Sequence, residues 1–234
     1  IGISKVPDPR LDVLTTMYTP RKRVPATVEF TDLIAAARTG AQALVDVAGY
    51  RNADALVHVV RAFGNPAAPH PSGSIDPARD AQAMEDELIL ADLAVAERRL
   101  ERLDKDIKKI HTPELKQERD LVQRCRTALE QGRPLRALEL TGDDARRLRG
   151  FQFLSAKPLL LVINLEERDV ASVGASVEKA AAHTGLTPFL ERAKTRAVAL
   201  CTTIELEIAQ LEAAEATAFL ADLGLADSGL DRVI

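Results

Sequence analysis

The segment Asn164-Leu165-Glu166-Glu167 holds the side chains with the clearest capacity for ligand recognition in this sequence. An asparagine followed three residues later by a carboxylate is a pattern that reads a purine base, because the amide and the carboxylate together offer donors and acceptors from one loop. The pattern follows the apolar run Leu159–Asn164 directly, and ligands of open α/β sheets bind at the carboxyl ends of strands. We therefore predict that Asn164 and Glu167 contact a purine.

Asp32 is a second candidate, because it ends the weaker alternating run Thr27–Asp32. In nucleotide switches an aspartate at such a position orients the magnesium ion, usually within Asp-x-x-Gly, where the glycine amide senses the terminal phosphate. Here Ala35 takes the place of that glycine. Alanine keeps the amide, but its Cβ restricts the backbone, so we expect an impaired switch with Asp32 as a water-mediated Mg²⁺ ligand.

Other catalytic patterns are lacking in the sequence. It contains no Gly-Lys pair, and hence no phosphate-binding loop, and neither a Gly-x-Gly-x-x-Gly motif nor a metal-ligand spacing. His58 lies within an apolar run and is expected to be a core or strand-edge residue without a catalytic role. Cys125 and Cys201 are too few for a disulfide framework, so we expect both to be reduced, packed thiols.

Composition limits the class of protein. The 234 residues are 46% hydrophobic, 28% charged and only 3% aromatic, which favours an aliphatic core and many helices over an all-β fold. The formal net charge of −4 gives no general attraction to nucleic acid or anionic lipid. No apolar run approaches the ~20 residues that span a bilayer, and no secretion signal is evident. These features predict a cytoplasmic protein without membrane contact.

Three short runs rich in Val, Leu and Ile predict buried strands: Ala55–Val60, Leu159–Asn164 and Ala197–Cys201. Continuous apolar runs are typical of strands covered on both faces, and helical patterns lie between them. The economical arrangement is an α/β fold with a mostly parallel sheet and flanking helices. From Glu205 to Leu223 the spacing of apolar residues predicts a further helix pair that stops at Gly224.

A long helical segment, roughly Pro77 to Glu130, interrupts this pattern. Apolar residues recur every seven positions on both sides of a break at His111-Thr112-Pro113, where Thr112 can cap the second helix. The sequence therefore predicts an inserted antiparallel coiled-coil hairpin. The stretch from Asp76 to Asp92 is acidic, whereas the tip region, from Arg98 to Arg126, is basic. That basic arm is either a solvated face or a docking surface for RNA or an acidic partner.

At these residues and along most of the chain, the sequence resembles the YchF/Obg-like ATPases, a branch of the translation-factor-related P-loop nucleotidases. The similar segments are Val6–Leu14, Pro25–Leu33, Asn52–Phe63, Ser74–Asp80, Glu87–Leu103, Phe153–Glu167 and Phe219–Ile234. The resemblance implies a Ras-like G domain formed by residues 1–75 and 135–234, with the coiled-coil insertion at 76–134. It also implies a preference for ATP over GTP, with Mg²⁺, and association with ribosomes.

The resemblance also assigns roles at the candidate site. Asn164 and Glu167 match the altered base-recognition motif of the family, in which Glu replaces the Asp of GTPases and disfavours guanine. Leu165 would lie nearby, and Cys201-Thr202-Thr203 matches the loop that supports the base from the last strand.

Departures from the family pattern leave two hypotheses. The phosphate-binding loop is expected upstream of Ile1 and the RNA-linked β-grasp (TGS) domain after Ile234, while Ala35 and Ala36 alter the second switch. The first hypothesis is a nucleotide-binding protein of this family, weak or inactive in hydrolysis as the chain stands. The alternative is a degenerate pseudo-nucleotidase that binds partners through its basic coiled-coil arm.

Overall fold

A parallel three-stranded sheet forms the centre of the molecule. The computed structural model describes residues 1–32, 49–174, 176–225 and 227–234. Within them β3 (Leu56–Ala62), β4 (Leu159–Leu165) and β5 (Thr195–Leu200) pair in the order β3-β4-β5, all parallel. The central strand β4 is buried almost throughout, as its continuous apolar run predicts. The α/β prediction is confirmed, and β3 extends two residues beyond its predicted end.

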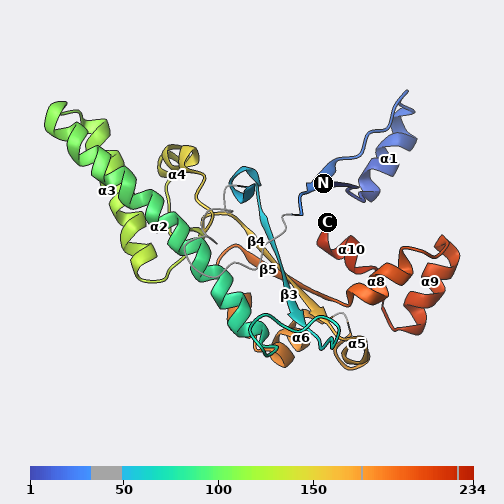
Figure 1. The fold of residues 1–234 in the computed structure, drawn as a ribbon. Helices are drawn as coiled ribbons and strands as arrows, with labels where there is room; N and C mark the ends of the chain where they lie inside the picture. The colour runs from blue at the N-terminus through green and yellow to red at the C-terminus, as the bar shows by residue number, and fades with distance from the viewer. Residues whose placement is uncertain (33–48, 175, 226) are drawn as a thin grey trace.

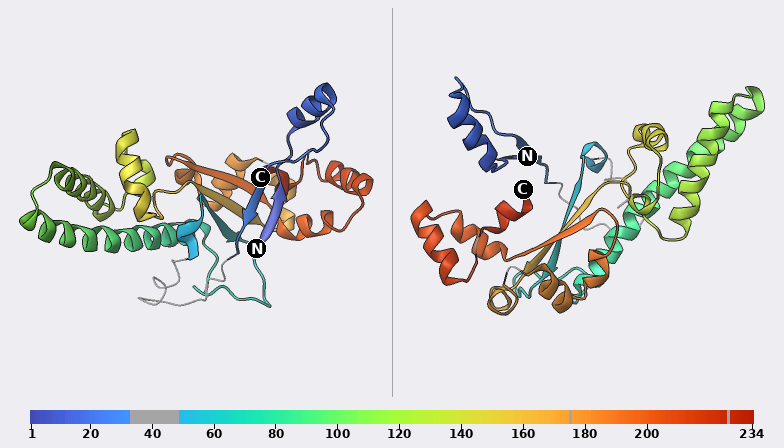
Figure 2. Two further views of the ribbon diagram at one scale, coloured as in Figure 1. Left: turned by 90° about the horizontal axis from the view of Figure 1, so that it is seen from above. Right: turned by 180° about the vertical axis from the view of Figure 1, so that it is seen from behind.

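An antiparallel pair of short strands lies beside this sheet without a ladder to it. β1 (Gly2–Lys5) pairs with β2 (Thr27–Phe30), and α1 (Pro9–Tyr18) lies between them in the sequence. Figures 1 and 2 show this unit to one side of the three parallel strands. The predicted strand ending at Asp32 thus ends two residues earlier, at Phe30.

Two long antiparallel helices, α2 (Pro77–Lys109) and α3 (Pro113–Glu130), project from the sheet (Figure 1). The Thr112 side chain accepts a hydrogen bond from the amide of Leu115 at 3.4 Å, and Pro113 occupies the first turn, as the sequence predicts. Residues at the seven-residue spacing pack between the helices, whereas Ile110, at the tip, is exposed.

Shorter helices complete the fold. In chain order they are η2 (Leu135–Ala137), α4 (Gly142–Leu148), η3 (Arg149–Phe151), α5 (Glu167–Val173), α6 (Val177–Thr184), α7 (Thr187–Leu190), α8 (Thr202–Ile208), α9 (Ala213–Asp222) and α10 (Gly229–Val233). Residues of α2, α5, α6, α7 and α8 form one hydrophobic core with the strands. A second cluster joins α2 and α3 to the segment 135–153. The predicted C-terminal helix pair is confirmed, and Gly224 ends α9 with a positive φ of 69°.

Buried charged residues of α2 form hydrogen bonds and an ion pair with the segment that follows α3. The side chains of Glu85 and Arg136 are each 1% exposed and form an ion pair, and Arg136 also donates to the carbonyl of Ser155 at 3.3 Å. Asp92 is fully buried and accepts from the amides of Leu154 and Ser155 at 2.9 and 2.7 Å. Burial raises the pKa of the Asp92 carboxyl against the opposing effect of these hydrogen bonds. Two acidic residues of the stretch from Asp76 to Asp92 are therefore internal.

His58 lies in β3 and has a buried Nδ1 without a hydrogen-bond partner within the described residues. Burial lowers the pKa of this imidazole, with Asp80 acting in the opposite direction. The lowered pKa favours the neutral form of this half-buried side chain of β3, and its lack of a catalytic role stays a prediction. No helix in the described part of the chain is long and apolar enough to cross a membrane.

Both cysteines are buried and unpaired, as predicted. Burial raises the pKa of Cys125, which lies between α2 and α3, to about 11 from an ordinary value of 9.0. Below pH 9 the thiol is protonated in both folded and unfolded chains and contributes nothing. Between about pH 9 and 11 only the unfolded chain loses the proton, so the free energy of unfolding should fall by roughly 2–3 kcal/mol through this group.

Urea unfolding of the wild type and of Cys125→Ala at pH 8.5 and at pH 10.5 measures this contribution. The variant starts from a lower stability because it leaves a small cavity, but it should lose less stability between the two pH values. Equal losses of stability in both proteins would contradict the assignment of this pH dependence to Cys125, since all other titrating groups are shared.

Candidate nucleotide-binding site

A cavity of about 930 Å³ opens at the carboxyl ends of the three parallel strands. Its walls come from the loops after β3, β4 and β5 and from the end of α9. The lining residues are Phe63, Gly64, Asn65, Asn164, Leu165, Glu166, Glu167, Arg168, Val170, Cys201, Thr202, Thr203, Asp222, Leu223 and Gly224. All strands of the sheet point toward this edge, so loops distant in sequence converge there.

Asn164 connects two of these walls. In the sheet it lies level with Arg61 of β3 and Leu200 of β5. Its Oδ1 accepts from the amide of Thr202 at 3.1 Å, and its Nδ2 donates to the Thr202 hydroxyl at 3.1 Å. The side chain is only 7% exposed, yet it reaches the cavity. An amide group has two donors and two lone pairs, so one donor and one lone pair remain for a ligand.

The other predicted base-site residues contribute in different ways. Leu165 is 1% exposed and belongs to the core under the cavity. Glu167 is the exposed first residue of α5 and has no hydrogen-bond or ion-pair partner within the described part of the chain, so its carboxylate is available. Cys201 is buried, whereas Thr203 is exposed. All of these residues line the same cavity.

Asp32 is not brought to this cavity. It lies two residues beyond the end of β2, is exposed and does not appear in the cavity lining. Across the described ranges there is no cluster of three or more His, Cys, Asp or Glu side chains that could hold a metal. Ala35 and Ala36 lie outside the described residues. The proposed role of Asp32 in holding magnesium therefore stays a prediction.

The sequence analysis missed two walls of the cavity. Phe63, Gly64 and Asn65 follow β3, and pairing of β3 with β4 was the signal that could have located them. Asp222, Leu223 and Gly224 come from the end of α9, more than fifty residues after Asn164. No local pattern marked that second group, since Gly224 predicts only the end of a helix.

The charges of the cavity suit a base better than a phosphate. Among the described lining residues the carboxylates are Glu166, Glu167 and Asp222, and the one cation, Arg168, pairs with Glu166 at 2.9 Å. Phe63 adds an aromatic ring, over which the Arg61 guanidinium lies at 4.8 Å from the centroid. An uncharged, planar ligand with hydrogen-bonding edges is complementary to these walls.

Comparison with known proteins identifies relatives along the whole chain. It is 34% identical to the ribosome-binding ATPase YchF of Bacillus subtilis over 238 residues, which cover 100% of the chain and 64% of that protein. The YchF protein of Haemophilus ducreyi is 35% identical over 245 residues, covering 100% of the chain and 63% of the relative. Obg-like ATPase 1 of Oryza sativa is 32% identical over 169 residues, or 70% of the chain and 43% of the relative. The chain thus spans somewhat less than two thirds of the length of its bacterial relatives.

Comparison with solved structures identifies a relative that carries the same family name. The YchF GTPase of Schizosaccharomyces pombe superposes with a TM-score of 0.79 and 25% identity, covering 99% of this chain and 62% of that one. No protein-family model matches the sequence. The similarity in sequence over the full length, together with the shared fold, shows that this chain belongs to the YchF/Obg-like ATPase family.

Proposed function

We propose that the cavity at the carboxyl ends of β3, β4 and β5 binds the purine base of a nucleotide, with ATP preferred over GTP. The observation that carries the proposal is the pair of hydrogen bonds between Asn164 and Thr202. These bonds hold the loops after β4 and β5 at a fixed separation, as a slot for a flat ring requires. Glu167 and the remaining donor and lone pair of Asn164 then read the edge of the base.

The described residues fit a base and do not fit a triphosphate with magnesium. The described lining of the cavity contains no lysine and one cation, Arg168, which is already paired, and it does not include Asp32. A triphosphate needs converging backbone amides and a cation, and these would have to come from outside the described part of the chain. We therefore infer that hydrolysis by the chain as it stands is weak or absent.

We further propose two functional units, a Ras-like G domain formed by residues 1–75 and 135–234 and a coiled-coil insertion at 76–134. The relatives from B. subtilis and H. ducreyi are named for ribosome binding, and we infer the same kind of partner, in the cytoplasm, for this chain. Cations at the arm's tip support this proposal. Arg102, Lys105, Lys108, Lys109 and Lys116 are exposed and have no acidic partner within the described ranges.

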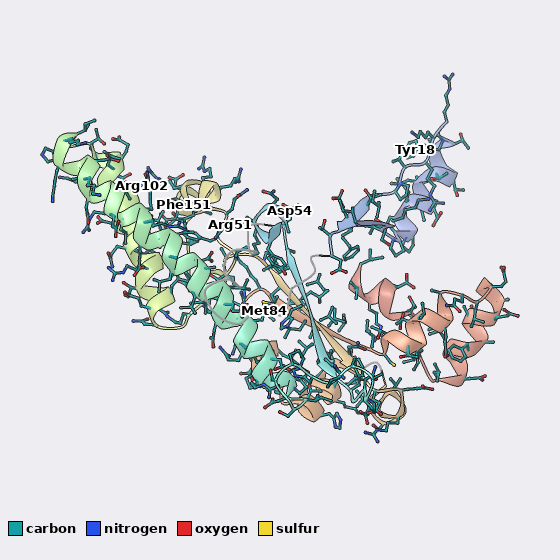
Figure 3. All side chains as sticks on the ribbon, viewed as in Figure 1. Tyr18, Arg51, Asp54, Met84, Arg102 and Phe151 are labelled. Atoms are coloured by element: carbon teal, nitrogen blue, oxygen red, sulfur yellow. The ribbon has the colours of Figure 1, made fainter. Side chains whose placement is uncertain are left out.

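In Figure 3, Met84 lies where α2 passes the strands, whereas Arg102 lies nearer the tip of the arm. Other cations of the arm are neutralised within it, since Arg99 pairs with Glu118 and Arg119 with Asp104. The unpaired tip suits contact with ribosomal RNA phosphates. In the alternative function, a pseudo-nucleotidase, this arm would be the only working surface.

Titration of the 234-residue chain with fluorescently labelled ATP and GTP, with and without Mg²⁺, tests the proposal. We expect saturable binding that prefers ATP and changes little with Mg²⁺, because the described contacts are to the base. Unlabelled adenosine should compete, whereas ribose triphosphate should not. Absence of binding of either nucleotide up to millimolar concentration would contradict the proposal and favour the partner-binding alternative.

A further inference from the structure

The C-terminal end of α9 forms a wall of the cavity that no predicted motif accounts for. Asp222 ends the helix, Leu223 caps it, and Gly224 reverses the chain with φ 69°. All three residues line the cavity together with the loops that follow the strands. A ligand held by Asn164 and Glu167 would therefore lie against the end of this helix.

This wall offers hydrogen-bond acceptors. The carbonyls of Phe219, Leu220 and Ala221 accept from the amides of Leu223, Leu225 and Gly224, respectively. The carbonyls of Asp222 and Leu223 accept no hydrogen bond within the described residues, and neither does the Asp222 carboxylate. The negative end of the helix dipole lies at the same place. Hydrogen-bond donors of a ligand are therefore attracted to this wall, and hydrogen-bond acceptors of a ligand are repelled.

The wall is also fixed in position before any ligand arrives. Leu225 is 7% exposed and lies in the main core, against which Leu220 and Leu223 pack. Just beyond, the amide of Gly229 donates to Glu205 of α8 at 2.8 Å, which connects the segment that follows α9 to α8. A preformed wall can discriminate between ligands, because moving it away from an unfavourable group would cost core packing.

Adenine and guanine differ in the group that such a wall would meet. Adenine carries an exocyclic amine, a donor, where guanine carries a carbonyl oxygen, an acceptor. We propose that the end of α9, through the Asp222 carboxylate and the adjoining main-chain carbonyls, selects adenine by accepting a hydrogen bond from this amine. The inference rests on the proposed binding of a purine base in the cavity and names a determinant of its specificity.

Isothermal titration of the full chain with adenosine, purine riboside and guanosine tests whether the end of α9 selects adenine. Purine riboside lacks the exocyclic group, so it measures binding of the ring alone. We expect adenosine to bind about tenfold more tightly than purine riboside, and guanosine more weakly than both. Asp222→Arg replaces the acceptor by donors, and should weaken adenosine about tenfold and strengthen guanosine while leaving purine riboside within about twofold.

Glu215→Arg is the matched control, because it makes the same charge change on α9 outside the cavity lining and should leave all three affinities unchanged. If no nucleoside binds the wild type, the proposed function itself fails. If all three bind but their ratios are the same in the wild type and in Asp222→Arg, the cavity binds purines and the role of α9 is wrong. Equal loss of all three in Asp222→Arg would likewise overturn the specificity role.

Discussion

Replacing Asn164 with alanine should lower the affinity of the chain for adenosine about thirtyfold, the largest effect on binding that we expect from a single substitution. The change removes both hydrogen bonds to Thr202 and leaves the Thr202 amide without its acceptor. Two such bonds contribute roughly 1 kcal/mol each, and the loss of order in the loops adds to this effect. Isothermal titration with adenosine measures the affinity directly.

Thr203→Ala is a suitable control for this prediction. Thr203 lines the same cavity next to Thr202, but it is exposed and its hydroxyl makes no hydrogen bond within the described residues. Its loss should change the affinity less than about threefold. If the two variants bind adenosine equally well, then the link between β4 and β5 does not shape the binding site.

Arg136→Met should lower the free energy of unfolding by about 3–5 kcal/mol, the largest effect on stability in the described part of the chain. The Arg136 side chain is 1% exposed, and its removal leaves the equally buried Glu85 carboxylate without its cation. The substitution also removes the hydrogen bond to the Ser155 carbonyl, at the junction of the second core cluster and the sheet. Urea unfolding followed by circular dichroism measures the loss.

The double variant Glu85→Met/Arg136→Met distinguishes an unpaired charge from simple loss of packing. With both charges gone, two apolar side chains of similar volume fill the site, and most of the stability should return. Among the described residues the Nε of Arg136 is buried without a partner, so the hydrogen bond to the Ser155 carbonyl is the one that the double variant still lacks besides the ion pair. A double variant as unstable as the single one would show that loss of packing, and not an unpaired charge, causes the instability.

Local sequence pattern was sufficient for much of the fold. The apolar run at Leu159–Asn164 located β4 and placed Asn164 at its end, because a strand buried on both faces leaves a continuous signal. Heptad spacing and the Thr112-Pro113 start likewise located the helix pair. Heptad spacing and helix capping depend on residues within a few positions of one another, so the sequence of a single element is enough to predict them.

Only the tertiary structure decided which distant residues meet. The acidic stretch from Asp76 to Asp92 has the composition of a solvated helix face, yet Glu85 lies inside against Arg136. The end of α9 likewise meets the loops after the strands in one cavity. The sequence by itself located the main strands and the long helix pair and predicted that Asn164 and Glu167 read a purine. The burial of charges and the cavity wall formed by the end of α9 depend instead on contacts between segments far apart in the chain. Such contacts follow from how whole elements pack, which no local spacing encodes.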